Sequence, residues 1–422
     1  MVVSQVVGVG IFLTPATMMR TVGTTGLALA IWVVIGTLSI AGAFCYAELT
    51  TRFPTAGGGY VFLREAFGSR SAFVFGWMAL LVMDPGITAA LGIGLAQYLL
   101  AALGGGPALV PVVAIAVTVA FGLFMLAGIG ASASVLRWTA IAKLAIVAIL
   151  VGVAAIRAWR PAPDGVDELA GSGAVGMDAL AASVIAAFFA FGGWWELGRM
   201  SEEVESPRRT MPRALIGGLT LVTIIYASIT VAYVLIAPGH VEGTDEAFVA
   251  AVGAAIFGDA AGRLLAVMVV IAVAGSLAAT LLGAPRMYLA LSRDGLFPAR
   301  LARFDERRGA APVLTLIQVT LACLLILLGS FEQILGYFVP VTIFFLALSA
   351  AAILRLPRPE ATSQVFRAPL HPLPILLFLL LIVSVLALFI VGQPAQTLLG
   401  AAVAAAGVPI SFVVLPRGGR QS

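Results

Sequence analysis

Two short stretches of this chain place glycines inside sequence that is otherwise apolar enough for a helix. The first lies in residues 4–15, where Gly8 and Gly10 are separated by one residue. The second contains the pair Gly192 and Gly193 among bulky aromatic residues. Each glycine in a helix interior costs about 1 kcal/mol relative to alanine. An interrupted helix also leaves backbone N–H and C=O groups unpaired, and these groups can bind a small polar ligand.

The polarity of the two interruptions indicates what such a ligand would be. A helix that begins near Gly10 presents free N–H groups and the positive end of its dipole, which favour a carboxylate. A helix that ends near Phe191 presents free carbonyls and a negative end, which favour an ammonium. A zwitterion with both groups on one carbon fits between them. The two interruptions therefore predict a site for an α-amino acid.

The composition indicates a membrane protein with many spans. Of the 422 residues, 61% are hydrophobic and only 10% are charged, and the mean hydropathy is +1.10. Soluble domains average about 25% charged residues. The two cysteines and two histidines are too few for a disulfide framework or a metal centre, and we expect no cofactor. The net charge of +4 follows the loops, so we expect no nucleic-acid partner.

Apolar runs long enough to cross a bilayer recur along the whole chain. No hydrophilic segment between them is long enough for a soluble domain. We predict about twelve transmembrane helices, at residues 2–21, 25–49, 71–103, 108–128, 132–157, 177–200, 211–237, 261–291, 311–330, 332–355, 373–392 and 395–415.

The two glycine interruptions lie in the first and sixth predicted spans, five spans apart. We therefore expect a single transport domain over residues 1–422, with a first five-helix repeat at 1–157, a second at 177–355 and two further helices at 373–415. An odd number of spans per repeat makes the repeats inverted in topology. Glycines also allow close helix packing, but interruptions at corresponding positions of two repeats are typical of a transporter site.

The arginines predict the orientation of the chain in the membrane. Nineteen of them lie in or beside alternate gaps between spans, and four lie on the opposite side. Cytoplasmic loops carry such an excess, so both termini are expected in the cytoplasm. Only seven residues precede Gly8, about 10 Å of helix. We therefore expect the natural first helix to begin further upstream.

Three of the ionisable residues that fall within predicted spans stand out, because charge inside a membrane is costly and often functional. Lys143 is the only lysine, and it lies near the middle of the fifth span. Its depth in the span argues against a side chain that extends to the membrane surface. Asp84 in the third span either pairs with a cation or handles a proton. Glu196, just past the second interruption, either lines the inner pathway as a gate or proton site or faces the cytoplasm.

Eight motifs along nearly the whole chain share a pattern with one family: residues 8–12 (GVGIF) with Pro15, 45–49 (CYAEL), 57–60 (GGGY), 64–68 (REAFG), 189–194 (FAFGGW), 202–203 (EE), 207–214 (PRRTMPRA) and 292–298 (SRDGLFP). Together they resemble the amino acid–polyamine–organocation (APC) superfamily of permeases, and within it most closely the L-type amino acid transporter branch. The resemblance implies an all-α integral membrane fold, the LeuT-like five-plus-five inverted repeat with broken first and sixth helices.

The resemblance also implies roles for individual residues. It assigns the substrate carboxylate to Gly8, Val9 and Gly10. It assigns the ammonium to carbonyls at Val6, Phe189 and Gly192, with Phe189 as an aromatic gate. Val9 stands where the family usually has serine, so one hydroxyl donor is lost. Lys143 resembles the lysine that takes the place of sodium in sodium-independent members. The full set of expected substrate-binding residues is Val6, Gly8, Val9, Gly10, Ile11, Phe189, Phe191, Gly192, Gly193 and Trp194.

These observations predict a secondary amino acid transporter of the plasma membrane that works by alternating access. We expect it to be sodium-independent, either an exchanger or coupled to protons. A carrier of polyamines or other cationic amines is the alternative, since Asp84 and Glu196 could bind a second ammonium. A sensor that does not transport is a further possibility on the same scaffold. An ion channel lacks the repeated polar rings it would need. An intramembrane enzyme lacks a metal motif or an activated nucleophile.

Overall fold

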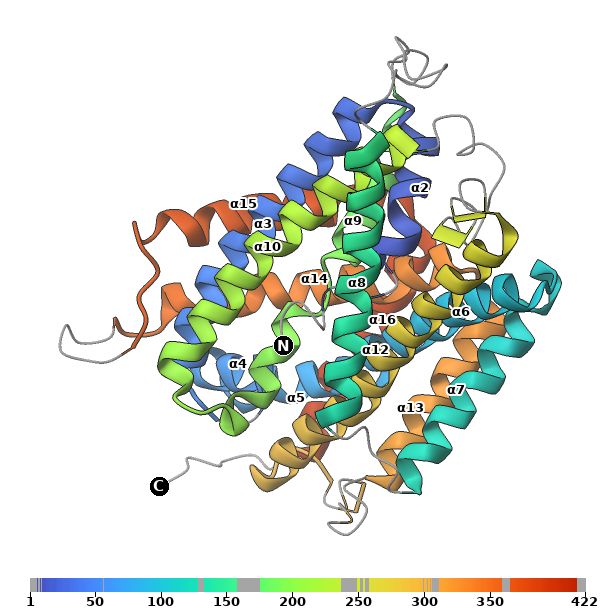
Figure 1. Ribbon diagram of the computed structural model, residues 1–422. Coiled ribbons are helices and arrows are strands. Elements are labelled where there is room, and N and C mark those ends of the chain that lie inside the picture. Colours follow the sequence, from blue (N-terminus) through green and yellow to red (C-terminus); the bar gives the residue numbers. More distant parts are fainter. Residues whose placement is uncertain are drawn as a thin grey trace.

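The structure is a computed structural model. It describes residues 6, 8, 10–55, 57–127, 133–157, 175–236, 249–250, 253–254, 258–298, 300–301, 303, 305, 311–358 and 365–415. Every regular element within these residues is a helix (Figure 1).

The first half of the chain contains α2 (Gly10–Val22), α3 (Thr25–Arg52), α4 (Gly59–Phe67), α5 (Ser69–Met78), the π-helical segment η1 (Ala79–Met83), α6 (Asp84–Leu103), the 3₁₀ turn η2 (Pro107–Leu109), α7 (Val110–Leu126) and α8 (Ala133–Arg157). The second half contains α9 (Met177–Ala190), the 3₁₀ helix η3 (Trp194–Glu203), α10 (Pro207–Ile236), α12 (Asp259–Arg293), α13 (Pro312–Leu328), α14 (Phe331–Arg355), α15 (Leu373–Gly392) and α16 (Pro394–Val414).

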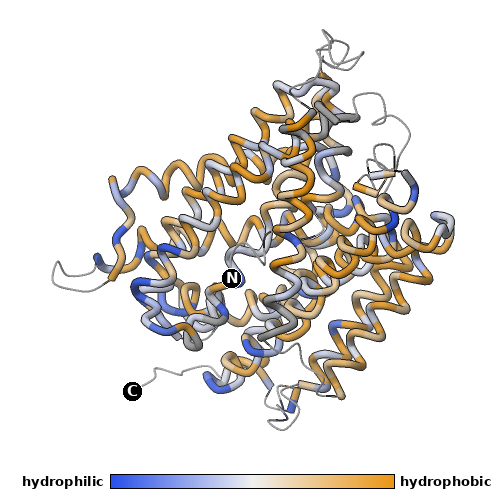
Figure 2. Tube along the Cα trace, viewed as in Figure 1, coloured by the Kyte–Doolittle hydropathy of each residue, from blue (hydrophilic) through white to orange (hydrophobic). Residues whose placement is uncertain are grey.

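The outer surface of the helices is apolar, as a membrane-embedded protein requires. Nine helical segments among the described residues are long and apolar enough to cross a bilayer. Helices α2, α8 and α13 overlap the other three predicted spans. Large aliphatic side chains such as Val112 and Leu123 of α7 are more than half exposed. Figure 2 shows hydrophobic residues along the helices and hydrophilic ones mostly at their ends. The prediction of an all-α membrane protein is confirmed, whereas the number of twelve spans stays a prediction.

Helices at corresponding positions of the two predicted repeats pack against each other. Helix α2 contacts α9, α3 contacts α10, α6 contacts α12, and α7 contacts α13. Figure 1 shows the last pair side by side at one edge of the molecule. Two repeats related by a two-fold axis would produce this pairing. The boundaries of the two repeats stay a prediction.

The predicted third span is one continuous helix that contains a short π-helical segment. Helix α5 continues through the π-helical segment η1 into α6, which begins at Asp84-Pro85. Pro85 has no N–H to donate to the carbonyl of Leu81, four residues earlier. The hydroxyl of Tyr337 in α14 donates to that carbonyl instead, at 3.2 Å. Proline therefore accounts for the irregular backbone directly before Asp84, and a neighbouring helix satisfies the freed group.

Helices α2 and α9 approach each other most closely at Gly10. A Cβ atom built on Gly10 would lie 2.5 Å from the Cα atom of Ala190, closer than real Cβ atoms come. Because that neighbour is backbone, no side-chain rotation can relieve the overlap. Gly10 is therefore required by the packing of the two helices as well as by the interruption.

We predict that Gly10→Ala forces α2 and α9 apart. Overpacking of this kind costs about 1–3 kcal/mol, so the midpoint of thermal unfolding of the purified protein in detergent should fall. Gly217→Ala is the matched control, because Gly217 also lies inside a helix but a Cβ atom added there would meet no neighbour within 4 Å. That variant should unfold at or slightly above the wild-type temperature. Equal midpoints for both variants would contradict the role assigned to Gly10.

Candidate functional site

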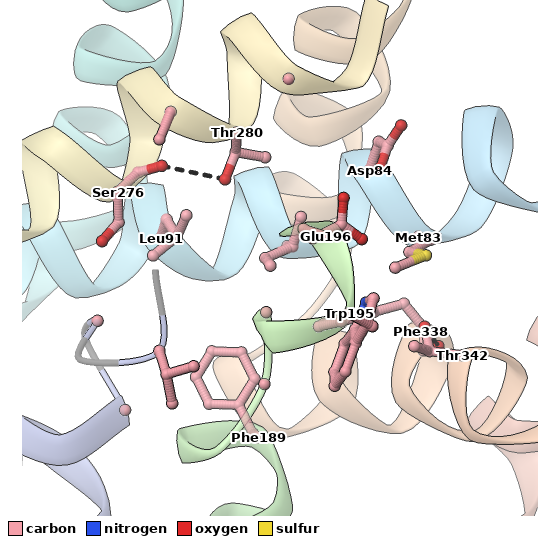
Figure 3. Close-up of a pocket in the computed structure, with 18 of the residues that line it drawn as sticks. Met83, Asp84, Leu91, Phe189, Trp195, Glu196, Ser276, Thr280, Phe338 and Thr342 are labelled. Carbon is pink, nitrogen blue, oxygen red and sulfur yellow. Dashed lines mark hydrogen bonds between the residues drawn. The ribbon is translucent and has the colours of Figure 1, made fainter. Parts of the chain in front are cut away.

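A cavity of about 1000 Å³, counting its open mouth, lies between the two predicted helix interruptions. Its walls come from α6, α9, η3, α12 and α14, together with the backbone before α2. Figure 3 shows Phe189 and Trp195 on one wall, Leu91 of α6 on another, and Ser276 and Thr280 of α12 above them. Six of the predicted binding residues line it, namely Val6, Gly8, Gly10, Phe189, Gly192 and Gly193.

The first interruption lies where the sequence predicts it. The N–H of Gly8 donates to the carbonyl of Val6 at 2.7 Å. The two residues are only two apart in the sequence, so this is not a helical hydrogen bond, and α2 begins at Gly10. The first N–H groups of α2 therefore face the cavity without helical partners. Val9, which is predicted to bind the carboxylate, lies outside the described residues.

The second interruption also lies where the sequence predicts it. Helix α9 ends at Ala190, and the N–H of Gly192 donates to the carbonyl of Phe189 at 2.8 Å. Gly193 has φ of +99°, a conformation that glycine adopts without strain. The chain then continues as the tighter helix η3. Helix α9 therefore ends at the cavity, and the prediction of broken first and sixth helices is confirmed.

One tyrosine that the sequence does not single out joins the two interruptions. The hydroxyl of Tyr226 in α10 lies 3.0 Å from the carbonyl oxygen of Val6 and 2.8 Å from that of Ala190. Both acceptors are backbone groups released by the breaks. Tyr226 is fully buried, and its ring packs edge-on against Trp32 and Phe191. No pattern of residue types could have identified it, because its partners are backbone atoms 220 and 36 residues away.

Three of the predicted binding residues lie outside the cavity lining. Phe191 packs between Trp32 and Tyr226, at ring-centroid distances of 5.8 and 4.9 Å. Trp194 packs against Tyr46 at 5.1 Å and is 2% exposed. Ile11 is completely buried. In the structure these three support the walls, and Phe189 and Trp195 present the aromatic surface to the cavity.

Lys143 reaches the cavity through one serine. Its side chain is 2% exposed, and Nζ donates to Oγ of Ser276 in α12 at 2.8 Å. Ser276 itself lines the cavity, one helical turn from Thr280 on α12 (Figure 3). The structure therefore places the lysine deep inside the protein and next to the site, and not at the membrane surface.

The other two ionisable residues meet at a single arginine. Nη1 of Arg199 lies 3.2 Å from Oδ1 of Asp84, and its Nε lies 2.7 Å from Oε2 of Glu196. The hydroxyl of Tyr288 in α12 donates to Oδ2 of Asp84 at 2.5 Å. Of the two roles expected for Asp84, pairing with a cation is what the structure shows. Glu196 lines the cavity instead of facing the cytoplasm.

The sequence groups Arg199 with the arginines of a cytoplasmic loop. The structure instead buries its side chain to 5% exposure, one helical turn beyond Glu196 on η3. The spacing of three residues between Glu196 and Arg199 is visible in the sequence and is typical of a helical ion pair. What the sequence could not show is that Asp84, 115 residues earlier, lies on the other side of the guanidinium.

A second charged cluster lies near the end of α12, apart from the cavity. Arg64 of α4 forms an ion pair with Asp294, and the hydroxyl of Tyr60 donates to the same carboxylate at 3.1 Å. Burial and the neighbouring Asp294 raise the pKa of Tyr60 above its usual value. The phenol therefore stays protonated and can donate. This cluster ties the loop helix α4 to α12.

A cavity between two broken helices in a helical membrane protein defines a secondary transporter. The family is shown by comparison with known proteins. The amino acid permease family model matches residues 1–413, and the chain belongs to this family.

Three relatives illustrate the range of the family. The serine/threonine exchanger SteT of Bacillus subtilis is 26% identical over 382 residues, which cover 89% of this chain and 86% of the relative. The large neutral amino acids transporter small subunit 2 of Homo sapiens is 27% identical over 98% of this chain and 78% of its own length. The human cystine/glutamate transporter is 25% identical over 98% of this chain and 83% of its own length.

We predict that Arg199→Met is strongly destabilising. The variant leaves the carboxyl groups of Asp84 and Glu196 buried and close together without their shared cation. Breaking a buried ion pair from one side costs about 3–5 kcal/mol, which thermal unfolding in detergent would measure. Adding Asp84→Asn and Glu196→Gln to Arg199→Met removes both stranded charges and should restore part of the loss. No recovery in the triple variant would show that Arg199 stabilises the fold by packing alone.

Proposed function

We propose that this protein moves α-amino acids across the membrane by alternating access, without sodium, and chiefly as an exchanger. The observation that carries the proposal is the meeting of the two helix interruptions at one cavity. There the start of α2 and the end of α9 meet, and Gly8, Gly10, Phe189 and Gly192 line the space beside them. Amino acid transport is the activity of the family to which the chain belongs.

We assign the two ends of the amino acid as follows. The carboxylate binds the N–H groups at Gly8, Val9 and Gly10, where the dipole of α2 is positive. The ammonium binds carbonyls at Val6 and Phe189 and the backbone at Gly192, where α9 ends. These groups recognise the part that all α-amino acids share. The named relatives act on serine and threonine, on large neutral amino acids and on cystine and glutamate. Membership of the family therefore does not determine which amino acid side chain this protein accepts.

We assign Lys143 to the position that a sodium ion would otherwise occupy. Its ammonium, held between α8 and α12 by Ser276, would supply a positive charge inside the protein next to the cavity. A built-in cation removes the need for a bound one, which supports sodium independence. Asp84 accepts hydrogen bonds on both oxygens from Arg199 and Tyr288. That pairing supports a structural role for Asp84 and favours exchange over proton coupling.

The protein is a multi-pass membrane protein. We place it in the plasma membrane with both termini in the cytoplasm. The support is the excess of arginine in alternate gaps, to which α4 and the end of α12 belong. In this orientation η3, Arg199 and Glu196 lie on the cytoplasmic side of the cavity.

Uptake into proteoliposomes tests the proposal. We predict that a radiolabelled amino acid from a panel enters vesicles preloaded with the same compound, at equal rates in sodium and in choline buffer, and without a pH gradient. The corresponding amine, which lacks the carboxylate, should not compete. Uptake of an amine in preference to every amino acid would favour the cationic-amine alternative. Strict dependence on sodium would contradict the assignment of Lys143.

We predict that Lys143→Met lowers exchange by about tenfold or more, since hydrogen bonds from charged groups contribute roughly 1.5–3 kcal/mol. The measurement is the initial rate of exchange per reconstituted protein. Arg263→Met is the matched control, because it removes a cation from an exposed position of α12. It should exchange at close to the wild-type rate. A Lys143→Met protein with the wild-type rate and pH profile would refute the role of this lysine.

A further inference from the structure

One end of the cavity carries more negative than positive charge. Asp84 and Glu196 both line it, and the cation that contacts them there is Arg199. Lys143 acts at the opposite end, through Ser276. Ser276 and Tyr288, the partner of Asp84, are twelve residues apart on α12, about 18 Å along the helix. With both carboxyl groups ionised, the Asp84–Arg199–Glu196 cluster has a net charge of −1.

Asp84 and Glu196 differ in the number of hydrogen bonds that their carboxylate oxygens accept. Both carboxylate oxygens of Asp84 have a donor, Arg199 for one and Tyr288 for the other. Oε2 of Glu196 faces the guanidinium. Oε1 of Glu196 is buried and accepts no hydrogen bond of normal geometry within the described residues, and the indole N–H of the adjacent Trp195 is likewise buried without an acceptor. A buried carboxylate oxygen without a donor is costly, and a ligand that supplies a donor would relieve that cost.

The walls beside Glu196 suit an aliphatic stem that ends in a cation. Phe188 and Trp195 lie with their rings stacked, with centroids 6.3 Å apart and planes 19° apart. Both line the cavity together with Phe189 and Phe338. Aromatic faces accept methylene groups and attract a neighbouring cation. Figure 3 shows Trp195 and Glu196 on the same element, facing the space between α6 and α14.

Glu196 lies on the same stretch of chain as the second interruption. It follows Gly192 by four residues, across the turn at Gly193 and into the first turn of η3, and both residues line the cavity. An amino acid bound at Gly8 and Gly192 could therefore extend a long side chain along the aromatic walls and present a terminal donor to Oε1 of Glu196.

We propose that this end of the cavity recognises the cationic side chain of a basic α-amino acid, and that Glu196 is the residue that selects it. The assignment rests on the proposed function, since the backbone of the amino acid must first bind at the two interruptions. A basic side chain brings the charge of the cluster to zero. An acidic side chain would place a third carboxylate beside Arg199. A neutral aliphatic side chain would fill the aromatic walls but leave Oε1 of Glu196 without a donor.

Competition for uptake in proteoliposomes tests this selectivity directly. The competitors are L-lysine, L-ornithine, L-norleucine, L-glutamine and L-glutamate, together with cadaverine, which has the lysine side chain without the carboxylate. Lysine or ornithine should compete at least about tenfold better than norleucine, as expected for a charge-assisted hydrogen bond, and glutamate should compete least. Norleucine competing as well as lysine or ornithine would overturn the proposal while leaving amino acid transport intact.

The variant Glu196→Gln keeps the shape of the side chain and removes its charge. Arg199 retains Asp84 as a neutralising partner, so the fold should be preserved. The apparent affinity for lysine or ornithine should fall about tenfold, and that for norleucine should change by less than about threefold. Glu332→Gln is the matched control, because Glu332 is exposed in the first turn of α14, and its selectivity should equal the wild type.

Each outcome separates this proposal from the function on which it rests. If Glu196→Gln leaves the ratio of lysine to norleucine unchanged, Glu196 does not select the side chain and the proposal fails. If Glu196→Gln does not fold, the ratio measured for the wild-type protein decides the question alone. If cadaverine is taken up as well as lysine, the carboxylate site of the proposed function fails but the cation site stands. If no amino acid and no amine is taken up, both fail.

Discussion

The structure depends on satisfying backbone groups that two helix interruptions release inside a membrane. Such groups have no water to pair with and must find partners in the protein. Tyr226 meets the need at both interruptions, since its one hydroxyl lies within hydrogen-bonding distance of the carbonyls of Val6 and Ala190. The close approach of Gly10 to Ala190 brings these carbonyls together. Gly8, Gly10 and Gly192 line the cavity beside this contact, where a zwitterion can reach the backbone of both interruptions.

The charged side chains of the cavity lie in two parts of it. Lys143 is joined through Ser276 to one part of the cavity and adds positive charge there. Glu196 lies beyond the end of α9, where an ammonium is expected, and adds negative charge. Arg199 keeps Asp84 and Glu196 close together although both are acidic. The side chains therefore give the cavity one part that is basic, at Ser276 and Lys143, and one that is acidic, at Asp84 and Glu196.

The fold and the backbone part of the site were predictable because both have local signals. Apolar runs predicted the helices, and Gly8, Gly10, Gly192 and Gly193 predicted the interruptions. Side-chain orientation around an irregular segment has no such signal. Phe191 and Trp194 were therefore expected in the cavity, but they pack behind its wall, and Trp195 takes the inner position.

Arg199 and Tyr226 show that contacts between distant segments also could not be predicted from the sequence. Arg199 resembles a loop arginine in the sequence because it follows an apolar span and precedes acidic residues. Its burial results from Asp84, which tertiary packing brings beside it. Tyr226 resembles an ordinary residue of an apolar helix, and its importance comes from two backbone oxygens on other segments. Contacts between distant segments decide both cases, and one sequence does not contain them.

The sharing of one proton at Tyr226 bears on how such a site can move. A phenol donates one hydrogen, so it pairs fully with one of the two carbonyls at a time. If the segment before α2 swings away during alternating access, the hydroxyl can keep Ala190 as its acceptor, and the carbonyl of Val6 is released toward the opening cavity, where water enters. The hydroxyl of Tyr226 therefore keeps an acceptor on either side of that motion. The two carbonyls share one donor in the closed site. Opening the site therefore breaks only part of one hydrogen bond, and costs less free energy than breaking a bond from a separate donor would.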